Sequence, residues 1–180
     1  MAPSLTNISN ISDSGTLELV GASYVTTAVL GGVTYVFVAS RIDDGVSVFS
    51  LAADGALTPV FDFADNALTN LGGAFALTTA VVGGTTYLYT AAISEYGLTG
   101  FSVGANGALT VVANVPDNAT LQLALTTDVE TAVVGGTTYL FAGGVNDSGV
   151  SVFSVAANGA LTNVDNVVDD ATSKIAGPEE

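Results

Sequence analysis

The chain has 180 residues, 49% of them apolar, which is enough for one ordinary domain with a sizeable core. Its 17 acidic residues face two basic ones, Arg41 and Lys174, and a net charge of −15 argues against nucleic acid or an anionic membrane surface as a partner. The absence of cysteine and histidine removes disulfides, Ser–His–Asp and Cys–His catalysis and zinc or iron sites, and no apolar run is long enough for a membrane helix.

The first candidate element in chain order is Ser4–Asp13. Its sequence, SLTNISNISD, resembles ALTNVDNVVD at Ala160–Asp169, so residues 4–13 are expected to form an extra outer strand of the kind that ends each repeat below. The first ten residues carry neither the basic nor the apolar segment of a secretion signal. We therefore expect either a piece of a longer chain or export by a route that needs no such signal.

Four short β-strands are predicted next, because aromatic and β-branched residues cluster between turn residues. Their predicted bounds are Val25–Leu30, Thr34–Ser40, Gly45–Ala52 and Ala56–Phe63. The turns between them contain Gly31-Gly32, Asp43-Asp44-Gly45 and Ala53-Asp54-Gly55. Glycine is expected to supply the positive φ that tight hairpin turns need.

The same pattern returns every 52 residues without an insertion or a deletion. Gly31, Gly83 and Gly135 mark the same turn, VVGGTTYL occurs twice, and so does GVSVFS. Such self-similarity indicates a repeat architecture. The predicted parts of this single repeat domain are the extra strand at 4–13, repeats at 14–65, 66–117 and 118–169, and a tail at 170–180.

Each repeat is predicted to be a four-stranded antiparallel meander, and the chain to be all-β. A four-stranded sheet that recurs every 40 to 50 residues or so is typical of β-propeller blades. Blades are buried on both faces, which explains strands that are apolar on both sides. The repeated aromatic residues are therefore expected in cores between blades rather than against a ligand: Tyr35, Tyr87, Tyr139, Phe49, Phe101 and Phe153.

The segments GGTTYLF and GVSVFSVAANGALT resemble the blades of lactonase-type, seven-bladed β-propellers. They resemble even more the near-identical propeller repeats of very large secreted bacterial proteins. The resemblance extends from about Leu5 to Asp169 and implies a propeller fold and an extracellular or secreted location. Lactonase-type enzymes use charged and histidine side chains around the central channel, whereas this chain has no histidine and one arginine within its repeats. The resemblance thus supports the fold and argues against carrying over the reaction.

Three blades cannot close a propeller ring, and an open stack leaves two apolar faces in water. Two solutions are open: two chains pair head-to-tail and close a six-bladed ring, or the three blades belong to a longer chain. We expect the homodimer. In a closed ring one of the two outer strands, 4–13 or 160–169, is surplus, and the two are expected to compete.

Most acids fall in turns and linkers and are expected to form a solvated polar rim: Asp43, Asp44, Asp54, Asp62, Asp65, Asp117, Asp169 and Asp170. Glu95, Asp128 and Glu130 are interpreted as single acids that the other repeats do not reproduce. Calcium, which prefers oxygen ligands, is an open alternative for the loops Asp43–Gly45 and Asn146–Gly149. Turns favour Asp and Asn without any metal, however.

The leading interpretation is a non-catalytic, structural or binding propeller module that self-assembles through its blade faces, as part of an extracellular scaffold or adhesin-like protein. No catalytic, cofactor-binding or metal-binding residue and no cofactor is assigned, the expected partner is a second copy, and the ligand stays open. The alternative is a divergent lactonase-like or glycan-active enzyme that uses only Asp and Glu, with or without calcium. Asp128 and Glu130 are the only acids near a strand that lines the central channel.

Overall fold

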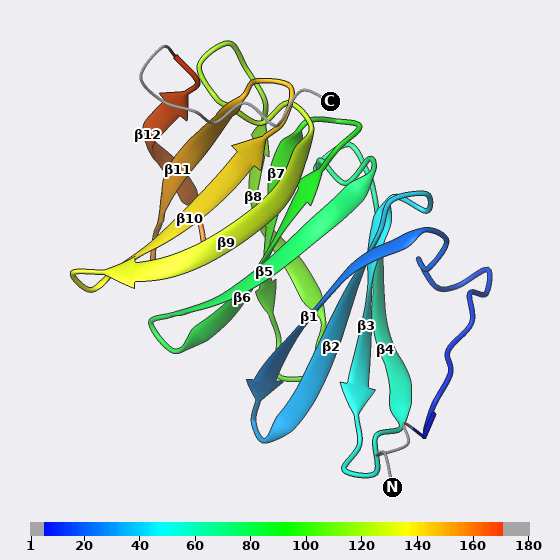
Figure 1. Cartoon of the computed structure of the whole chain (residues 1–180). Helices are drawn as coiled ribbons and strands as arrows, with labels where there is room; N and C mark the ends of the chain where they lie inside the picture. Colours follow the sequence, from blue (N-terminus) through cyan, green and yellow to red (C-terminus); the bar gives the residue numbers. More distant parts are fainter. Residues whose placement is uncertain (1–5, 171–180) are drawn as a thin grey trace, which may run out of the picture.

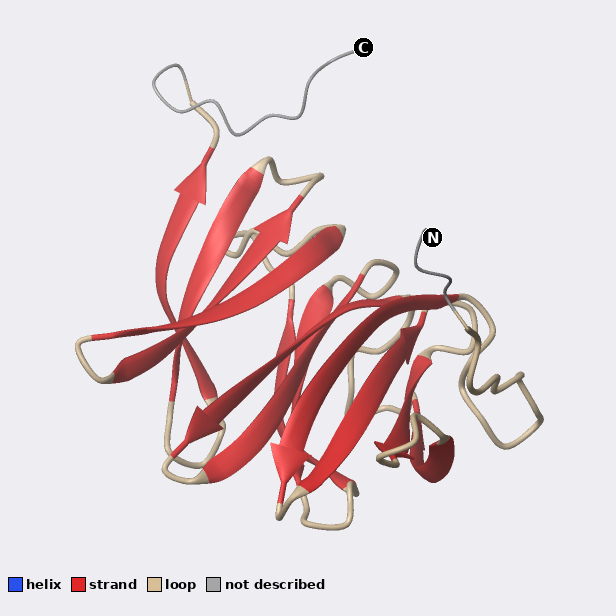
Figure 2. Ribbon diagram, turned by 60° about the horizontal axis from the view of Figure 1, so that its bottom comes forward, coloured by secondary structure: helices blue, strands red, loops and turns tan. Residues whose placement is uncertain are grey.

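The fold is described for residues 6–170 from a computed structural model. These residues form β-strands joined by turns and loops and contain no helix (Figure 2), and hence no helix long and apolar enough to cross a membrane. Consecutive groups of four strands form antiparallel sheets in chain order, as predicted, and are called blades 1, 2 and 3.

The strands of each blade pair as a simple meander, first with second, second with third, and third with fourth. Blade 1 comprises β1 (Ala22–Leu30), β2 (Val33–Ser40), β3 (Gly45–Leu51) and β4 (Leu57–Ala64); blade 2 comprises β5 (Ala74–Val82), β6 (Thr85–Ala92), β7 (Gly97–Val103) and β8 (Leu109–Pro116); blade 3 comprises β9 (Thr126–Val134), β10 (Thr137–Gly144), β11 (Gly149–Val155) and β12 (Leu161–Val168). β1 begins earlier than predicted because it continues through a bulge between Ala22 and Tyr24.

The hairpin turns follow the glycine pattern only in part. Gly31-Gly32 has φ of 58° and 84°, as two-residue hairpin turns require. In the β2–β3 turn the positive φ, 57°, belongs to Asp44, so the expectation that glycine supplies it there is wrong. Gly45 is needed for space instead, because a Cβ at this position would lie 2.7 Å from the carbonyl oxygen of Phe63.

The three blades are arranged radially. Their first strands, β1, β5 and β9, lie side by side at the centre, whereas β4, β8 and β12 lie at the outside (Figure 1). The Thr131 hydroxyl of β9 donates to the Thr79 carbonyl of β5 at 3.1 Å and ties two of these inner strands together. The arrangement is that of propeller blades and not of a stack of solenoid coils.

Two apolar cores hold the blades together. Tyr35, Phe37 and Phe101 lie in the core between blades 1 and 2, and Tyr87 and Phe153 lie in the core between blades 2 and 3. All five are at most 5% exposed, so the prediction of inter-blade packing is confirmed for Tyr35, Tyr87, Phe101 and Phe153. Full burial of one such side chain stabilises the fold by roughly 1.5–3 kcal/mol.

The N-terminal segment differs from the prediction. Residues 6–14 form no strand, so the extra outer strand expected at 4–13 is absent from its described part, and residues 4 and 5 lie outside the described residues. An outer strand pairs with the third strand of its own blade, and the described part of the chain contains no sheet ahead of blade 1 to offer that partner.

The segment instead covers the outer face of blade 1, the face turned away from blade 2 (Figure 1). Ile11 of this segment, together with Leu17 and Leu19 of the linker that follows it, packs there against a small cluster made of Val36, Val38 and Phe49. Phe49 is therefore buried against this segment, at 2% exposure, and not between two blades as expected. One of the two apolar faces predicted to be open is thus partly covered by the chain itself.

Candidate functional site

Several turn acids accept hydrogen bonds from backbone N–H groups, whereas Asp54, Asp169 and Asp170 are exposed as expected for a polar rim. Asp43, Glu95 and Asp147 hold equivalent places in the three repeats, so the interpretation of Glu95 as a single acid is wrong. Each accepts a hydrogen bond from the linker that precedes its own blade. The donors are the N–H groups of Leu19 and Val20 for Asp43 (3.0 and 2.6 Å), Gly72 for Glu95 (3.1 Å) and Ala124 for Asp147 (2.8 Å). These linkers lack a strand partner, so the carboxylates satisfy their N–H groups.

A pair of acids, Asp65 and Asp117, fixes the start of the linkers that lead to blades 2 and 3. Asp65 accepts from the Thr69 hydroxyl at 2.7 Å and from the Leu71 N–H at 3.2 Å, and Asp117 accepts from the Leu123 N–H at 3.3 Å. Burial raises the pKa of the Asp117 carboxyl, although its backbone hydrogen bonds oppose the rise. These acids are structural, and the expectation of a solvated rim is wrong for them.

A buried hydroxyl in the third strand of each blade forms another repeated contact. Ser47, Thr99 and Ser151 each accept a backbone N–H of the linker, from residues 18, 70 and 122, at 2.7–3.0 Å. In blade 1, Ser47 donates to Asp62 at 2.5 Å. Burial raises the pKa of the nearby Glu18, and the negative charges of Asp62 and Asp43 add to the rise.

The calcium alternative finds no support in this geometry. Asp43 and Asp147 use carboxylate oxygens for backbone N–H groups, and Asp44 accepts from the Gly73 N–H at 2.6 Å. Over residues 6–170 no cluster of three or more acidic side chains is arranged to hold a metal ion. Oxygens already occupied by N–H donors are poor ligands for a cation.

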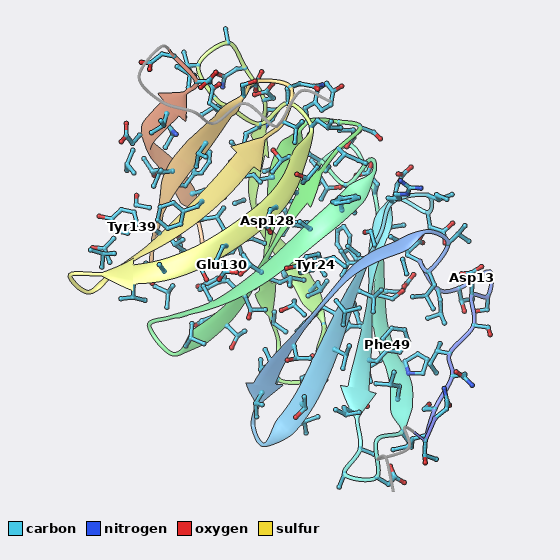
Figure 3. All side chains as sticks on the ribbon, viewed as in Figure 1. Asp13, Tyr24, Phe49, Asp128, Glu130 and Tyr139 are labelled. Carbon is cyan, nitrogen blue, oxygen red and sulfur yellow. The ribbon has the colours of Figure 1, made fainter. Side chains whose placement is uncertain are left out.

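The only acids on the inner strands are Asp128 and Glu130 of β9. Both are exposed, whereas Val129 between them points into the core toward blade 2 and is 1% exposed. Because side chains alternate along a strand, the two carboxylates share the face turned away from blade 2 (Figure 3). Their counterparts in blade 2 are Ala76 and Thr78, both buried and neutral.

A cavity of about 250 Å³ opens beside Asp128 on the same face of blade 3. Its lining includes Thr127, Asp128, Gly143, Gly144, Ser148 and Val150. Blade 1 has Ala39-Ser40 and blade 2 has Ala91-Ala92 where blade 3 has Gly143-Gly144. This glycine pair was a visible signal that sequence reasoning missed, because nothing in the sequence shows that the positions face an open side.

The same position is filled by leucine in the other blades. Leu71 lies in one core with Ala39 and Val46, and Leu123 lies in the other core with Leu98. Both leucines come from the linker of the following blade and are 0% exposed. The cavity is therefore an inter-blade position without its leucine, and Asp128 lies at its edge.

A second cavity, of about 430 Å³, lies between the β1–β2 and β5–β6 hairpin ends. Val29, Val81, Thr86 and Val103 are among its lining residues, none of which is ionisable. This cavity offers shape and apolar surface but no acid or base. The carboxylate pair of β9 is therefore the better candidate for chemistry.

No family model matches the sequence, and no curated protein matches it. Solved structures do resemble it. An exo-β-1,3-galactanase from Phanerochaete chrysosporium is 12% identical, with 83% of this chain and 39% of that one covered and a TM-score of 0.58. The periplasmic gluconolactonase of Pseudomonas aeruginosa is 18% identical, with 74% and 36% covered and a TM-score of 0.56.

The GH43_1 enzyme of Xanthomonas citri is 14% identical, with 84% of this chain and 57% of that one covered and a TM-score of 0.54. The chain thus spans only about a third to somewhat more than half of the length of these structures. Identities this low show the fold alone. The solved structures are β-propellers, and the chain has the fold of three consecutive propeller blades.

Proposed function

We propose that this chain supplies the carboxylate-bearing part of a β-propeller that binds a polyhydroxylated ligand, either a glycan or a sugar lactone. The observation that carries the proposal is the placement of Asp128 and Glu130 on the inner strand of blade 3, exposed and on one face. Both positions are neutral in the other two blades, where Tyr24 and Ala76 match Asp128. A single binding pocket requires the repeats to differ at the positions that line it.

Carboxylates suit this class of ligand because each oxygen accepts hydrogen bonds from sugar hydroxyls. Residues two apart on a strand have Cα atoms roughly 6.5 Å apart. Paired carboxyls of glycoside hydrolases lie about 5 to 9.5 Å apart, so the spacing of Asp128 and Glu130 suits such a pair. Hydrolysis also needs a proton donor held at raised pKa, and inner strands β1 and β5 carry no acid. Turnover would therefore need residues from further blades.

The structural neighbours support a ligand of this class. The galactanase structure contains β-1,3-galactotriose, a structure of the Xanthomonas enzyme contains xylotriose, and a third neighbour is a gluconolactonase. Because the chain matches only part of each structure, the activity of those proteins is a hypothesis for this chain. Binding by the carboxylate pair is the part of it that this chain can carry alone.

NMR titration with β-1,3-galactotriose, xylotriose and glucono-δ-lactone tests the proposal. Wild type should show shifts centred on β9 for at least one ligand, and the double variant Asp128→Asn, Glu130→Gln should lose them. Asp54→Asn is the matched control, because Asp54 is an exposed turn acid far from β9 in sequence. Absence of binding by wild type, or retained binding by the double variant, contradicts the proposal.

The second candidate is the non-catalytic module of an extracellular scaffold or adhesin-like protein. It is favoured by the turn acids, since Asp43, Asp65, Asp117 and Asp147 all hold backbone and none is free for chemistry. Assays with aryl glycosides and lactones separate the two candidates. Ligand binding without release of product supports the module, and turnover that depends on Asp128 and Glu130 supports the enzyme.

A further inference from the structure

Blade 3 keeps a stacking face that no described residue covers. Tyr139, Phe141, Val150 and Val152 face away from blade 2 and are only partly buried. Their counterparts in blades 1 and 2 lie in the inter-blade cores, where Phe37, the counterpart of Phe141, is 0% exposed. Blade 3 thus presents the kind of surface that elsewhere in the molecule receives another blade.

Each interior contact includes a tyrosine hydroxyl. Tyr35 and Tyr87 donate to main-chain carbonyls in the third turn of the following blade, at 2.9 and 2.8 Å. Tyr139 is the next member of this series, and no described residue accepts a hydrogen bond from its hydroxyl. Tyr35 and Tyr87 donate to Ala105 and Ala157, and the residue at the same place in the third turn of blade 1 is Ala53. A second copy of the chain can therefore supply the missing carbonyl.

The same turn carries a glycine that makes room for the tyrosine ring. A Cβ on Gly107 would lie 2.7 Å from the ring of Tyr35, and Gly159 has the same relation to blade 2. Gly55 holds this position in blade 1, yet a Cβ added there would meet the side chain of Ile8, at 3.2 Å, and no aromatic ring. Gly55 thus leaves space for a tyrosine that the chain itself does not place there.

The cavity beside Asp128 fits into the same series. Leu71 and Leu123 fill its counterparts on blades 1 and 2 and are fully buried. Leu19 is the first leucine of this series, 52 residues before Leu71, and is only partly buried. The chain has one unfilled leucine position and one incompletely buried leucine, at opposite ends of its stack of blades.

Residues 6–13 lie where the outer strand of a preceding blade would lie. Ile8 lies beside Gly55 in the same way that Val60, one repeat later in the chain, lies beside Gly107. Three repeats further on, Val164 of β12 matches Ile8. The segment therefore occupies the position that β12 of a second copy would take.

We propose that the open face of blade 3 docks onto the outer face of blade 1 of a second copy, and that two such contacts close a symmetric six-bladed ring. Leu19 of the second copy then fills the cavity, Tyr139 donates to its Ala53 carbonyl, and β12 displaces its residues 6–13. The inference rests on the repeated contacts and is independent of the proposed ligand.

The docked copy also brings a basic residue toward the carboxylates of β9, whose blade 2 counterparts Ala76 and Thr78 are buried between two blades. Ile93, the blade 2 counterpart of Arg41, lies against Gly73, whose N–H donates to Asp44 of blade 1. In the docked pair, Arg41 of the second copy takes the place of Ile93, and Ser148 takes the place of Asp44. Because Ser148 lines the cavity beside Asp128, Arg41 then lies at the edge of this cavity. The only basic residue of the repeats thus meets the acidic inner strand.

Light scattering during size-exclusion chromatography tests the assembly. Wild type should have twice the chain mass of 17.8 kDa, falling to 17.8 kDa on dilution. Val152→Lys places a charge in the contact and should be monomeric. Val133→Lys is the matched control and should stay dimeric, because Val81, its counterpart in the flanked blade 2, remains 66% exposed. A wild type that is monomeric throughout, a mass that keeps rising with concentration, or two variants that behave alike overturns the proposal.

Two further variants keep the test independent of folding defects, which circular dichroism monitors. Tyr139→Phe removes one hydrogen bond from each of the two contacts and should weaken the dimer about 25-fold. Ile11→Asp loosens residues 6–13 from blade 1 and should strengthen the dimer, because the incoming β12 then has a weaker competitor. An unchanged or weaker dimer in Ile11→Asp contradicts the displacement of this segment.

Discussion

Blades 2 and 3 have closely similar sequences but different surroundings. The Tyr87 side chain of blade 2 is 3% exposed and its hydroxyl is hydrogen-bonded to the following blade, whereas Tyr139 of blade 3 is only partly buried and its hydroxyl has no partner among the described residues. The backbone of the two blades is the same meander. The contribution of a side chain to the free energy of unfolding therefore depends on whether a neighbouring blade lies over it. Variants at equivalent positions of different blades measure this dependence.

The largest difference is expected for the phenylalanines of the second strands. Phe37→Ala removes a ring that is 0% exposed between blades 1 and 2 and should lower the free energy of unfolding by about 3–5 kcal/mol. Phe141→Ala truncates the partly exposed counterpart in blade 3 and should lower it by about 1–2 kcal/mol. Urea denaturation of both variants, at a protein concentration where light scattering shows a single copy, gives the comparison. Equal losses would show that the open face is as well packed as the interior.

The turn glycines give the next largest difference. Gly159 and Gly55 have φ of 82° and 89°, so alanine is strained at both. Only at Gly159 would the new Cβ also overlap an aromatic ring, that of Tyr87. We expect Gly159→Ala to lower the free energy of unfolding by about 2–3 kcal/mol and Gly55→Ala by about 1 kcal/mol. The difference between the two melting curves isolates the close approach of turn and ring, and its absence would mean that Tyr87 moves aside freely.

The repeat made most of the fold predictable. The 52-residue spacing, the Gly31-Gly32 turn and the apolar alternation specify four strands per blade and their order. The extra strand at 4–13 was wrong because sequence similarity to β12 says nothing about whether a pairing partner is present. Local pattern predicts what a segment is able to form, and tertiary context decides whether it does.

The site was less predictable than the fold. Asp128 and Glu130 could be found because they break the repeat, but the Gly143-Gly144 cavity could not, since its meaning depends on which face lies open. The turn acid Asp43 was assigned to solvent, although it binds the linker of its own blade from 24 residues away. The residue type alone does not reveal such a long-range hydrogen bond, because Asp is favoured in turns for local reasons as well.

Thr90 of blade 2 should respond in the opposite direction. Its hydroxyl is buried and has no hydrogen-bond partner among the described residues, while blade 1 has Val38 at this position. A buried hydroxyl without a partner lowers stability, so Thr90→Val should raise the free energy of unfolding by about 1 kcal/mol. The reverse change in blade 1, Val38→Thr, is the matched control and should lower it. A loss of stability in Thr90→Val would reveal a hydrogen bond to water at this site.

The smallest effect is expected at the linker residue that differs in charge between blades 1 and 3. Glu18 of blade 1 has a pKa raised above its ordinary value by burial and by Asp62 and Asp43, whereas blade 3 has the neutral Gln122 at the same place. The folded state therefore binds the Glu18 proton more tightly than the unfolded state, and this group lowers stability at pH values above its folded-state pKa.

Glu18→Gln should therefore stabilise the protein at neutral pH, by about 0.5 kcal/mol because the side chain is only partly buried and its charge is screened by solvent. The advantage should shrink as the pH falls through the folded-state pKa and vanish below the ordinary value of 4.5, where Glu18 is protonated in both states. Thermal melts from pH 7 to pH 4 measure the difference, with Gln122→Glu in blade 3 as the reciprocal variant. An advantage that grows on acidification would mean that the Glu18 carboxylate accepts stabilising hydrogen bonds in blade 1, and that the charge difference between the two blades favours the folded state.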